Sequence, residues 1–235
     1  MNLARRQPMN LARAALLLTL GLVNGAATAD PTSSLVTFAN NAGGAQGWRG
    51  MQTDSGLGGT LVDPDFGNGA PALRTKMNNY FIAWWNNTNP AYLGDWSGLG
   101  TVTIRVDVFA TLVWFGFGNP VPRDLVVELR DYDNTPPGVP WVSVWYNLGT
   151  LNVGNGWQTR SVTIGDTASV ALPAGWGGTG DYLGTGLPPG RSFASVLASV
   201  DIILFHTSPP GTVSGFVDYD VALDNIAVDV APARR

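Results

Sequence analysis

The sequence predicts an all-β fold, a two-sheet antiparallel β-sandwich of the jelly-roll type. Apolar residues alternate with others in Thr101–Ala110 and again in Val142–Leu148, which is the period of a strand with one side on a core. The chain has 30 glycines and 16 prolines, and turn sequences such as Gly154-Asn155-Gly156 separate the alternating segments. Beyond residue 29, no window shows a helical apolar stripe longer than two turns. We therefore expect many strands joined by loops.

Residues 1–29 have the pattern of a secretory signal peptide. Three arginines precede the apolar run Ala14–Val23, and the small residues Ala27-Thr28-Ala29 follow it. The run is too short to span a bilayer, so we expect no transmembrane anchor. Cleavage is expected before Asp30, which makes the protein secreted or periplasmic. Residues 30–235 are expected to form one domain, with its core at about 34–228.

Charge and cysteine content exclude several classes of protein. The leader contains three of the 13 basic residues and none of the 17 acidic ones, so its removal changes the net charge from −4 to −7. An acidic chain without a basic cluster is unsuited to nucleic acid or to an anionic membrane surface. The chain has no cysteine, which excludes disulfides and thiolate metal sites. The domain must therefore depend on its hydrophobic core.

The expected strands follow one another with turn signals between them. An early strand opens the domain, alternating segments fill the middle, and a continuous apolar run with β-branched residues precedes a Pro-Pro-Gly turn and the last strand. The last strand is expected to pair with the first. The strands are Leu35–Phe38, Tyr80–Trp85, Thr101–Ala110, Leu125–Arg130, Val142–Leu148, Trp157–Ile164, Val200–Phe205 and Val217–Val228.

Smaller features complete the expected fold. Short helical turns are expected at Tyr92–Ser97 and Ser192–Ala198, and a long surface loop at Thr167–Arg191, which is rich in glycine. Within Thr101–Ala110, alternation predicts one inward set, namely Val102, Ile104, Val106 and Val108. Adjacent residues on a strand point to opposite faces, so only one of Trp84 and Trp85 can enter the core. The apolar residues that share a face with Trp84 favour Trp84 as the inner one.

Three short motifs in order indicate a family resemblance. They are Phe38 with Gln46-Gly47-Trp48, then Tyr80-Phe81-Ile82-Ala83 leading into Tyr92-Leu93-Gly94-Asp95, and finally Leu223-Asp224-Asn225-Ile226. Over Ser34–Val228 the chain resembles the laminin B (domain IV) type module of secreted bacterial proteins, a jelly roll similar to galactose-binding-like and carbohydrate-binding folds. It departs from that pattern at Ala39, where an acidic residue is usual, and at Trp84-Trp85, where a proline is usual.

The resemblance implies a structural calcium ion. In such modules the ion commonly joins an acidic residue of the opening strand to a closing aspartate. Asp224 matches the closing aspartate, and Asn40 is the candidate to replace the missing acid beside Ala39. Calcium prefers carboxylate and amide oxygens, which both residues offer. The alternative is that the aspartates cap turns and keep the surface soluble.

The residues do not indicate an enzyme. His206 is the only histidine, and the sequence contains no G-x-S-x-G motif for a nucleophilic serine. Glu128 would need a second carboxylate across a cleft to act as a glycosidase, and no particular aspartate is indicated. A jelly-roll hydrolase or lyase is therefore the least favoured interpretation.

Aromatic residues beside loops favour a glycan-binding module. Sugars stack their C–H faces on aromatic rings, and amide side chains bind hydroxyls. The candidate residues are Trp85, Asn86, Asn87, Trp114 and Trp141, and the expected partner is a polysaccharide or a cell-surface glycan. The alternatives are that the tryptophans are covered, and that the protein is a structural or adhesive surface domain without a small ligand.

Overall fold

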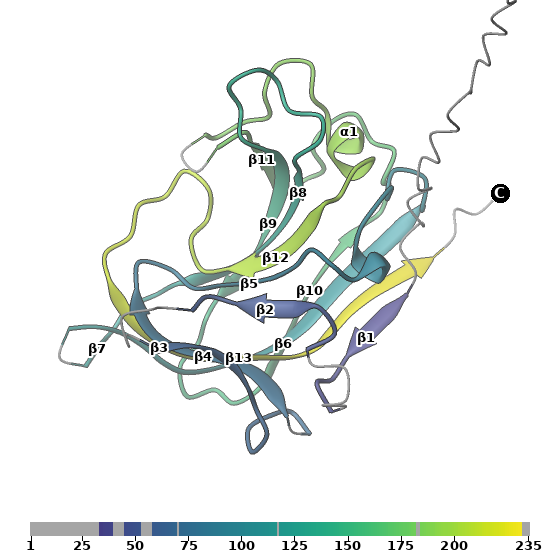
Figure 1. Ribbon diagram of the computed structural model, residues 1–235. Coiled ribbons are helices and arrows are strands. Elements are labelled where there is room, and N and C mark those ends of the chain that lie inside the picture. The colour runs from purple at the N-terminus through teal and green to yellow at the C-terminus, as the bar shows by residue number, and fades with distance from the viewer. Residues whose placement is uncertain are drawn as a thin grey trace, which may run out of the picture.

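The computed structural model describes residues 33–39, 45–52, 58–69, 71–116, 118–181 and 184–231. Two antiparallel sheets pack face to face, one above the other in Figure 1, which confirms the predicted β-sandwich. The predicted signal peptide and Asn40 lie outside the described residues. None of the helices in the described ranges is long and apolar enough to cross a membrane.

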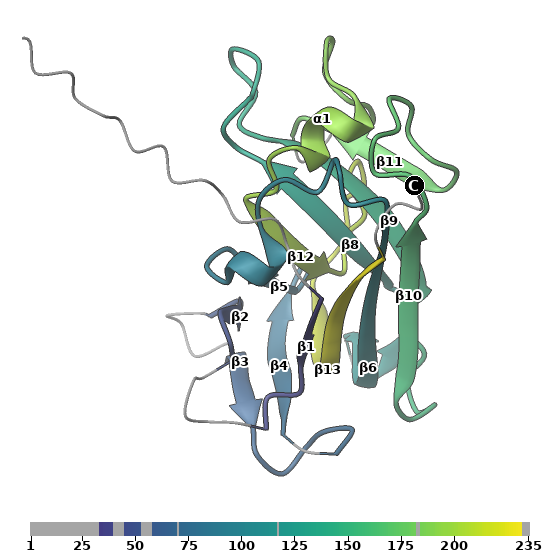
Figure 2. The same cartoon turned by 90° about the vertical axis from the view of Figure 1, so that its right-hand side faces the viewer.

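The first sheet has seven strands and carries both ends of the domain. Its main path runs β10-β6-β13-β4-β3, and β1 and β7 are added to β13 and β6. Figure 2 shows the strands from β3 to β10 side by side. Their bounds are β1 Ser34–Val36, β3 Gly58–Asp63, β4 Ala72–Asn79, β6 Thr101–Phe115, β7 Asn119–Pro120, β10 Gln158–Ile164 and β13 Val217–Ala231.

The second sheet has six strands in the order β11-β9-β8-β12-β5-β2. Its inner face packs on the first sheet, and its outer face is where the candidate site lies. The strands are β2 Trp48–Gly50, β5 Ala83–Asn86, β8 Asp124–Asp131, β9 Val142–Thr150, β11 Trp176–Thr179 and β12 Ile202–His206.

The first and last strands pair as predicted. Leu35 lies opposite Ala227, and Val36 lies opposite Ile226. Along its other edge β13 pairs with nearly the whole of β6, and both strands are 15 residues long. β13 therefore lies between β1, the first strand, and β6, and joins both into one sheet.

The core between the sheets contains the predicted valine and isoleucine set. Ile104 is fully buried, as are Val102 and Val106, and Val108 is nearly so. Phe205 and Trp84 approach from the second sheet and belong to the same core cluster. The alternation in Thr101–Ala110 thus assigned the inward face correctly.

The expected strand Tyr80–Trp85 is wrong in its first half. β4 ends at Asn79 in the first sheet, and β5 begins at Ala83 in the second. Residues 80–82 carry the chain from one sheet to the other, so they cannot continue either ladder. Thr207 anchors this crossing, because its hydroxyl accepts a hydrogen bond from Ile82 N and its backbone N–H donates to Ile82 O.

Five strands were not predicted from the sequence, namely β2, β3, β4, β7 and β11. In β4, Leu73, Thr75 and Met77 are buried while Arg74 and Lys76 are not, which is a regular alternation. β11 lies within the expected loop Thr167–Arg191, and its Trp176 is buried against Phe193 at a ring distance of 5.2 Å. Two of the glycines that suggested a loop, Gly177 and Gly178, are part of this short edge strand.

The two helical turns had different outcomes. The turn expected at Ser192–Ala198 is helix α1, Phe193–Leu197, with Ser192 and Ser195 forming a capping box. The turn expected at Tyr92–Ser97 is instead a 3-10 helix at Pro90–Tyr92, which begins earlier because Asn89 caps it through Ala91 N. Residues Leu93–Ser97 are not helical.

Candidate functional site: a cleft on the six-stranded sheet

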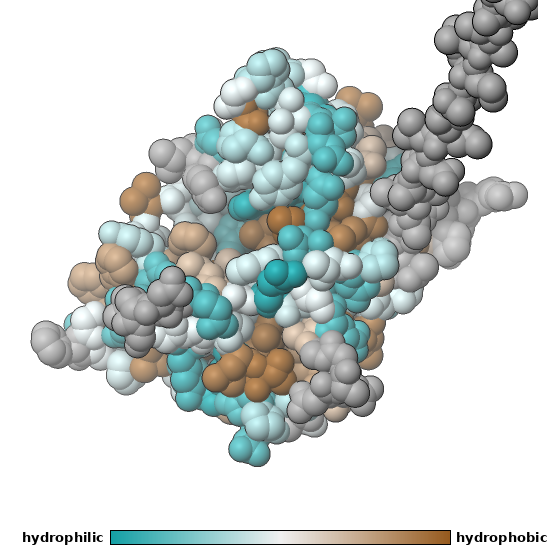
Figure 3. All heavy atoms as spheres, in the orientation of Figure 1, coloured by the Kyte–Doolittle hydropathy of each residue, from teal (hydrophilic) through white to brown (hydrophobic). Residues whose placement is uncertain are grey.

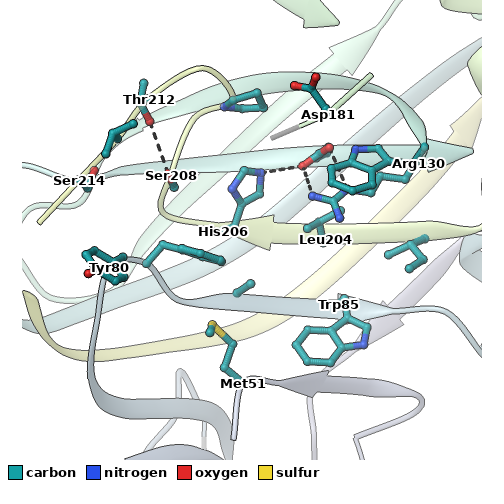
Figure 4. A pocket seen from close by; sticks show the side chains of 17 residues that line it. Met51, Tyr80, Trp85, Arg130, Asp181, Leu204, His206, Ser208, Thr212 and Ser214 are labelled. Atoms are coloured by element: carbon teal, nitrogen blue, oxygen red, sulfur yellow. Dashed lines mark hydrogen bonds and ion pairs between the residues drawn. The ribbon is translucent and has the colours of Figure 1, made fainter. Parts of the chain in front are cut away.

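A cleft of about 890 Å³ lies on the outer face of the six-stranded sheet. Its size falls within the range of ligand-binding clefts, roughly 300–1,000 Å³. Strands β5, β12 and β8 supply the floor, and loops supply the walls (Figure 4). The lining residues are Met51, Tyr80, Phe81, Ala83, Trp85, Glu128, Arg130, Trp141, Asp181, Ile202, Leu204, His206, Ser208, Pro210, Thr212, Val213 and Ser214.

The floor follows from the period of two along each strand. On β12, Ile203 and Phe205 point into the core, so Leu204 and His206 point into the cleft. On β5, Trp84 is in the core and Trp85 lines the cleft. The predicted assignment of Trp84 to the inner face is therefore confirmed.

The strand register places two tryptophans in one row across the sheet. Trp85 lies opposite Leu204, Leu204 lies opposite Glu128, and Glu128 lies opposite Trp145. Three strand spacings separate the backbones of Trp85 and Trp145, which is roughly 14 Å. Since all four residues occupy equivalent positions of the ladder, the row crosses the outer face at right angles to the strands.

Trp145 extends the cleft beyond its lined floor. Its partner on the edge strand is Gly177, and a methyl group at Gly177 would collide with the indole ring. The ring therefore lies over the backbone of β11, where only glycine leaves room for it. Trp145 is partly exposed, so one side of the ring is covered by β11 and the row ends in an aromatic surface.

A network of charged groups occupies the centre of the floor. The Glu128 side chain is 1% exposed, and its oxygens accept hydrogen bonds from Arg130 Nε at 2.8 Å and Arg130 Nη2 at 3.0 Å. His206 Nε2 lies 3.1 Å from Glu128 Oε2. Figure 4 shows both partners directed at the carboxylate. Glu128 is thus held between a guanidinium and an imidazole.

The partners of Glu128 set its charge. Burial alone would raise the pKa of Glu128, but the hydrogen bond with His206 and the charge of Arg130 outweigh it and lower the pKa to about 2. Burial acts in the opposite sense on Arg130, and the charge of Glu128 outweighs it, so the pKa of Arg130 is raised. The pair is therefore ionised at all ordinary pH values.

Trp141 closes one side of the cleft and is mostly covered. Arg130 packs against the Trp141 ring, with its guanidinium carbon 4.4 Å from the ring centroid, and the ring of Tyr132 lies at a centroid distance of 6.2 Å. The residue is 5% exposed. Trp141 holds Arg130 in place by a cation–π contact more than it offers a free ring.

The opposite wall is formed by the loop after β12. Pro210, Thr212, Val213 and Ser214 line the cleft there, and Val213 is 87% exposed. The Thr212 hydroxyl donates to Pro209 O at 2.6 Å, which tightens the turn. At the same end, the rings of Tyr80 and Phe216 lie 3.8 Å apart and both are exposed.

The structure brings together only two of the five predicted sugar-binding residues, Trp85 and Trp141. Asn87 is exposed but does not line the cleft, and Trp114 lies on β6 of the other sheet. The five residues therefore do not form one site.

The prediction for Asn86 needs correction, because its side chain is fully buried on the inner side of β5. Its oxygen accepts hydrogen bonds from Thr88 N and Asn89 N, and its amide donates to Gln46 O. Asn86 therefore holds the two loops beside β5 and has no free group for a sugar.

Most of the cleft floor was not predicted from the sequence. Val200–Phe205 is a continuous apolar run in which no alternation distinguishes the two faces. Leu204 within it is 6% exposed, yet it belongs to the cleft and not to the core cluster. Met51, Tyr80 and Phe81 come from segments whose position depends on the crossing between the sheets. Trp145 carried a usable signal, because its outward position on β9 followed from alternation.

The predicted calcium ligands are only partly described. Asp224 lies opposite Asp107 across β13 and β6, and its carboxylate accepts hydrogen bonds from Asn68 N at 2.8 Å and Asn225 N at 2.7 Å. Burial, with a contribution from the charge of Asp107, raises the pKa of Asp224 to about 6. Among the described residues, no group of three or more histidine, aspartate or glutamate side chains could hold a metal ion.

Comparison with known proteins shows a likeness in fold. The family 11 carbohydrate-binding module from Clostridium thermocellum, in complex with a β-1,3-1,4-mixed-linked tetrasaccharide, matches 88% of this chain and 100% of its own length, with a TM-score of 0.50 and 14% identity. The family 11 module of a cellulosomal cellulase from the same organism gives a TM-score of 0.50 over 88% of this chain and 99% of that one, again with 14% identity. The structural neighbours are thus jelly-roll β-sandwiches.

A third solved structure is less similar to this chain. A family 22 carbohydrate-binding module of Clostridium thermocellum has a TM-score of 0.46, with 12% identity over 88% of this chain and 99% of its own length. No protein-family model matches the sequence, and no curated protein matches it.

Proposed function

We propose that this chain is a non-catalytic glycan-binding module whose ligand lies in the cleft across β5, β12, β8 and β9. The observation that carries the proposal is the row from Trp85 to Trp145, which places two aromatic rings at the ends of one face with Leu204 and Glu128 between them. A sugar chain presents apolar C–H faces at intervals, and rings on one face match them. Clefts lined by aromatic groups with a few fixed polar groups are typical ligand sites.

The likeness in fold supports this proposal. The family 11 module with which the chain aligns over nearly its whole length is a carbohydrate-binding module in complex with a tetrasaccharide. We transfer from it the class of ligand, an oligosaccharide or polysaccharide, and not the particular sugar. The expected partner is thus a polysaccharide or a cell-surface glycan.

The chemistry of the cleft supports binding without catalysis. A glycosidase needs one carboxyl group with a raised pKa as the acid and a second carboxylate across the sugar. Glu128 has the opposite character, because its pKa is lowered to about 2 and its oxygens are paired with Arg130 and His206. Its role in the proposal is to hold Arg130 and to shape the floor.

Binding to soluble polysaccharides tests the proposal directly. Affinity gel electrophoresis against a panel of neutral glucans, xylans, mannans and galactans should show retardation by at least one polymer. Trp85→Ala should abolish that retardation, because it removes one end of the row. Trp114→Ala is the matched control, since it removes the same side chain from the other sheet and should leave binding unchanged. A parent protein that no polymer retards would refute glycan binding.

A structural or adhesive surface domain remains the second candidate function. Apolar side chains are exposed at the end of the cleft, namely Tyr80, Phe115, Val213 and Phe216. Figure 3 shows that apolar side chains reach the surface in separate groups among hydrophilic ones. Under this alternative, replacing Tyr80 and Phe216 with serine would abolish adhesion to a surface, whereas Trp85→Ala would have no effect.

The proposal has three further parts, which concern export, family and calcium. Export is proposed from the leader in residues 1–29, and N-terminal sequencing of exported protein, starting at Asp30, would establish it. Membership of the laminin B (domain IV) type is proposed from the three motifs and their order. Calcium is proposed at Asp224, where Asp107 supplies a second carboxylate and Asn40 is the predicted further ligand.

A further inference from the structure

We propose that the cleft selects glycans that carry O-acetyl groups, and that the acetyl methyl enters a hollow over Ala83. This inference rests on the proposed glycan binding and adds the chemical class of the ligand. It starts from two observations about the floor, which are the shape around Ala83 and the engagement of the polar groups.

Large side chains surround Ala83 on the outer face of the sheet. Across the ladder, His206 lies opposite Ala83 on one side, and on the other side Met51 N donates to Ala83 O. Trp85 is two residues along the strand and Phe81 two residues before it, and all of these residues line the cleft. A methyl side chain among four larger ones leaves a hollow in the floor.

The walls of this hollow are mostly carbon and sulfur. Met51 and Phe81 are apolar, Leu204 lies diagonally beside Ala83, and nitrogen atoms come from the His206 ring and the indole Nε1 of Trp85. Figure 4 shows Met51, Trp85 and His206 around the same part of the cleft. A ligand group that fills the hollow must therefore be small and apolar at its tip.

Two nearby polar side chains, those of Glu128 and Thr212, already have partners within the protein. Glu128 is bound by Arg130 and His206, and the Thr212 hydroxyl on the wall donates to Pro209 O. A sugar hydroxyl pressed onto Ala83 would find only the Trp85 indole N–H and the His206 ring in place of its several hydrogen bonds to water, which is unfavourable. Acetylation removes that hydroxyl's donor and adds a methyl group, so the acetylated sugar suits the floor better.

Matched polymers provide the test. Partially O-acetylated glucomannan and partially O-acetylated xylan are each compared with the same sample after mild alkaline removal of the esters. Isothermal titration calorimetry should give about tenfold tighter binding to at least one acetylated polymer, since one buried methyl group is worth about that much in a pocket. Equal affinity for the acetylated and de-esterified forms would overturn this inference and leave glycan binding intact.

Variants connect the preference to Ala83. Ala83→Leu fills the hollow and should make the affinities for the acetylated and de-esterified polymers about equal. Ala168→Leu makes the same change at an exposed position and should preserve the preference for the acetylated polymer. Met51→Ala removes one wall and should also weaken the preference, which keeps the test valid if Ala83→Leu fails to fold. A preference that both cleft variants retain would overturn the inference.

The two proposals fail in different ways. If none of the four polymers binds, the acetyl inference is overturned, and the broader glycan panel decides on glycan binding itself. If the polymers bind and Trp85→Ala abolishes binding, but de-esterification changes nothing, only the acetyl inference fails.

Discussion

Trp84 and Trp85 are neighbours on β5 and serve opposite faces of the same sheet. Trp84 is fully buried in the core between the sheets, and Trp85 lines the cleft on the outside. The two side chains are chemically identical and differ only in their surroundings. Substituting each in turn therefore distinguishes an effect on stability from an effect on ligand binding.

Substitution of each tryptophan should therefore give a different result. Trp84→Ala should lower the free energy of unfolding by about 3–5 kcal/mol, as expected for a large aromatic side chain removed from a core. Trp85→Ala should cost far less stability and abolish glycan binding. Urea unfolding and affinity electrophoresis on the two variants measure both quantities. A large stability loss for Trp85→Ala with no glycan affinity in the parent would show that Trp85 only covers the sheet.

Ile104 tests which face of β6 supports the sandwich. The residue is fully buried, so Ile104→Ala should lower the free energy of unfolding by about 2–5 kcal/mol. The Thr103 hydroxyl on the opposite face lies 2.9 Å from the Thr163 hydroxyl, so Thr103→Ala is a suitable control with an expected loss of about 1 kcal/mol. Both values come from equilibrium urea unfolding. A loss below about 0.5 kcal/mol for Ile104→Ala would contradict the assigned face.

Asn86 and Asn87 should also behave differently. Asn86→Ala leaves the backbone N–H groups of Thr88 and Asn89 without their acceptor and removes one of the two donors to Gln46 O. We expect a loss of about 1–3 kcal/mol in stability. Asn87 is exposed, so Asn87→Ala should change stability by no more than about 0.5 kcal/mol. Neither change should affect glycan affinity when the protein is folded. Loss of binding in a folded Asn86→Ala variant would return this residue to the site.

The sequence was most informative where a local pattern decides the structure. The alternation in β6 is a local property, and so is the opposition of Trp84 and Trp85, and both were predicted correctly. The pairing of the first strand with the last was also predicted, whereas the register that places Leu35 opposite Ala227 was not.

The cleft depends on features that no local pattern contains. Whether Leu204 faces a core or a cleft depends on which loops rise beside β12. The break after Asn79 depends on β4 and β5 belonging to different sheets, and one partner of Asn86, the carbonyl of Gln46, lies in a loop 40 residues away. Strand alternation could assign faces, but it could not show that Met51, Ala83 and His206 meet.

Glu128 should make stability depend on pH in acid. Its pKa is about 2 in the folded protein, below the ordinary value of 4.5, so the ionised form is favoured by folding. Its contribution, on the order of 3 kcal/mol, is complete above pH 4.5 and is lost as the pH falls toward 2. Thermal unfolding of the parent and of Glu128→Gln across this range measures the difference between them.

The Glu128→Gln variant should be less stable at neutral pH, because Arg130 loses its buried counter-charge. Removing one partner of a buried ion pair costs about 3–5 kcal/mol. The gap between variant and parent should narrow as the pH approaches 2, because the parent then loses the same charge. A gap that stays constant from pH 6 to pH 2 would contradict the lowered pKa of Glu128.

Asp224 should make stability depend on pH in the direction opposite to Glu128, and at higher pH. Its pKa is raised to about 6 from 3.8, so the folded protein favours the protonated carboxyl. The stability that this proton provides is complete below about pH 4 and is lost as the pH rises through 6. Asp224→Asn cannot ionise and should lack this loss, which comparison of melting temperatures between pH 4 and pH 7 would show.

Calcium should offset the cost of ionising Asp224 if the ion binds there. At pH 7, about 10 mM calcium exceeds the dissociation constants of roughly 10⁻⁴–10⁻³ M that are typical of extracellular modules, so it should raise the melting temperature of the parent. The same addition should have little effect at pH 4.5, where Asp224 is protonated, and none on Asp224→Asn. Magnesium is the control ion, because it prefers a tighter octahedral site. A melting temperature that calcium leaves unchanged at pH 7 would remove the calcium proposal, while the pH dependence of Asp224 would stand on its own.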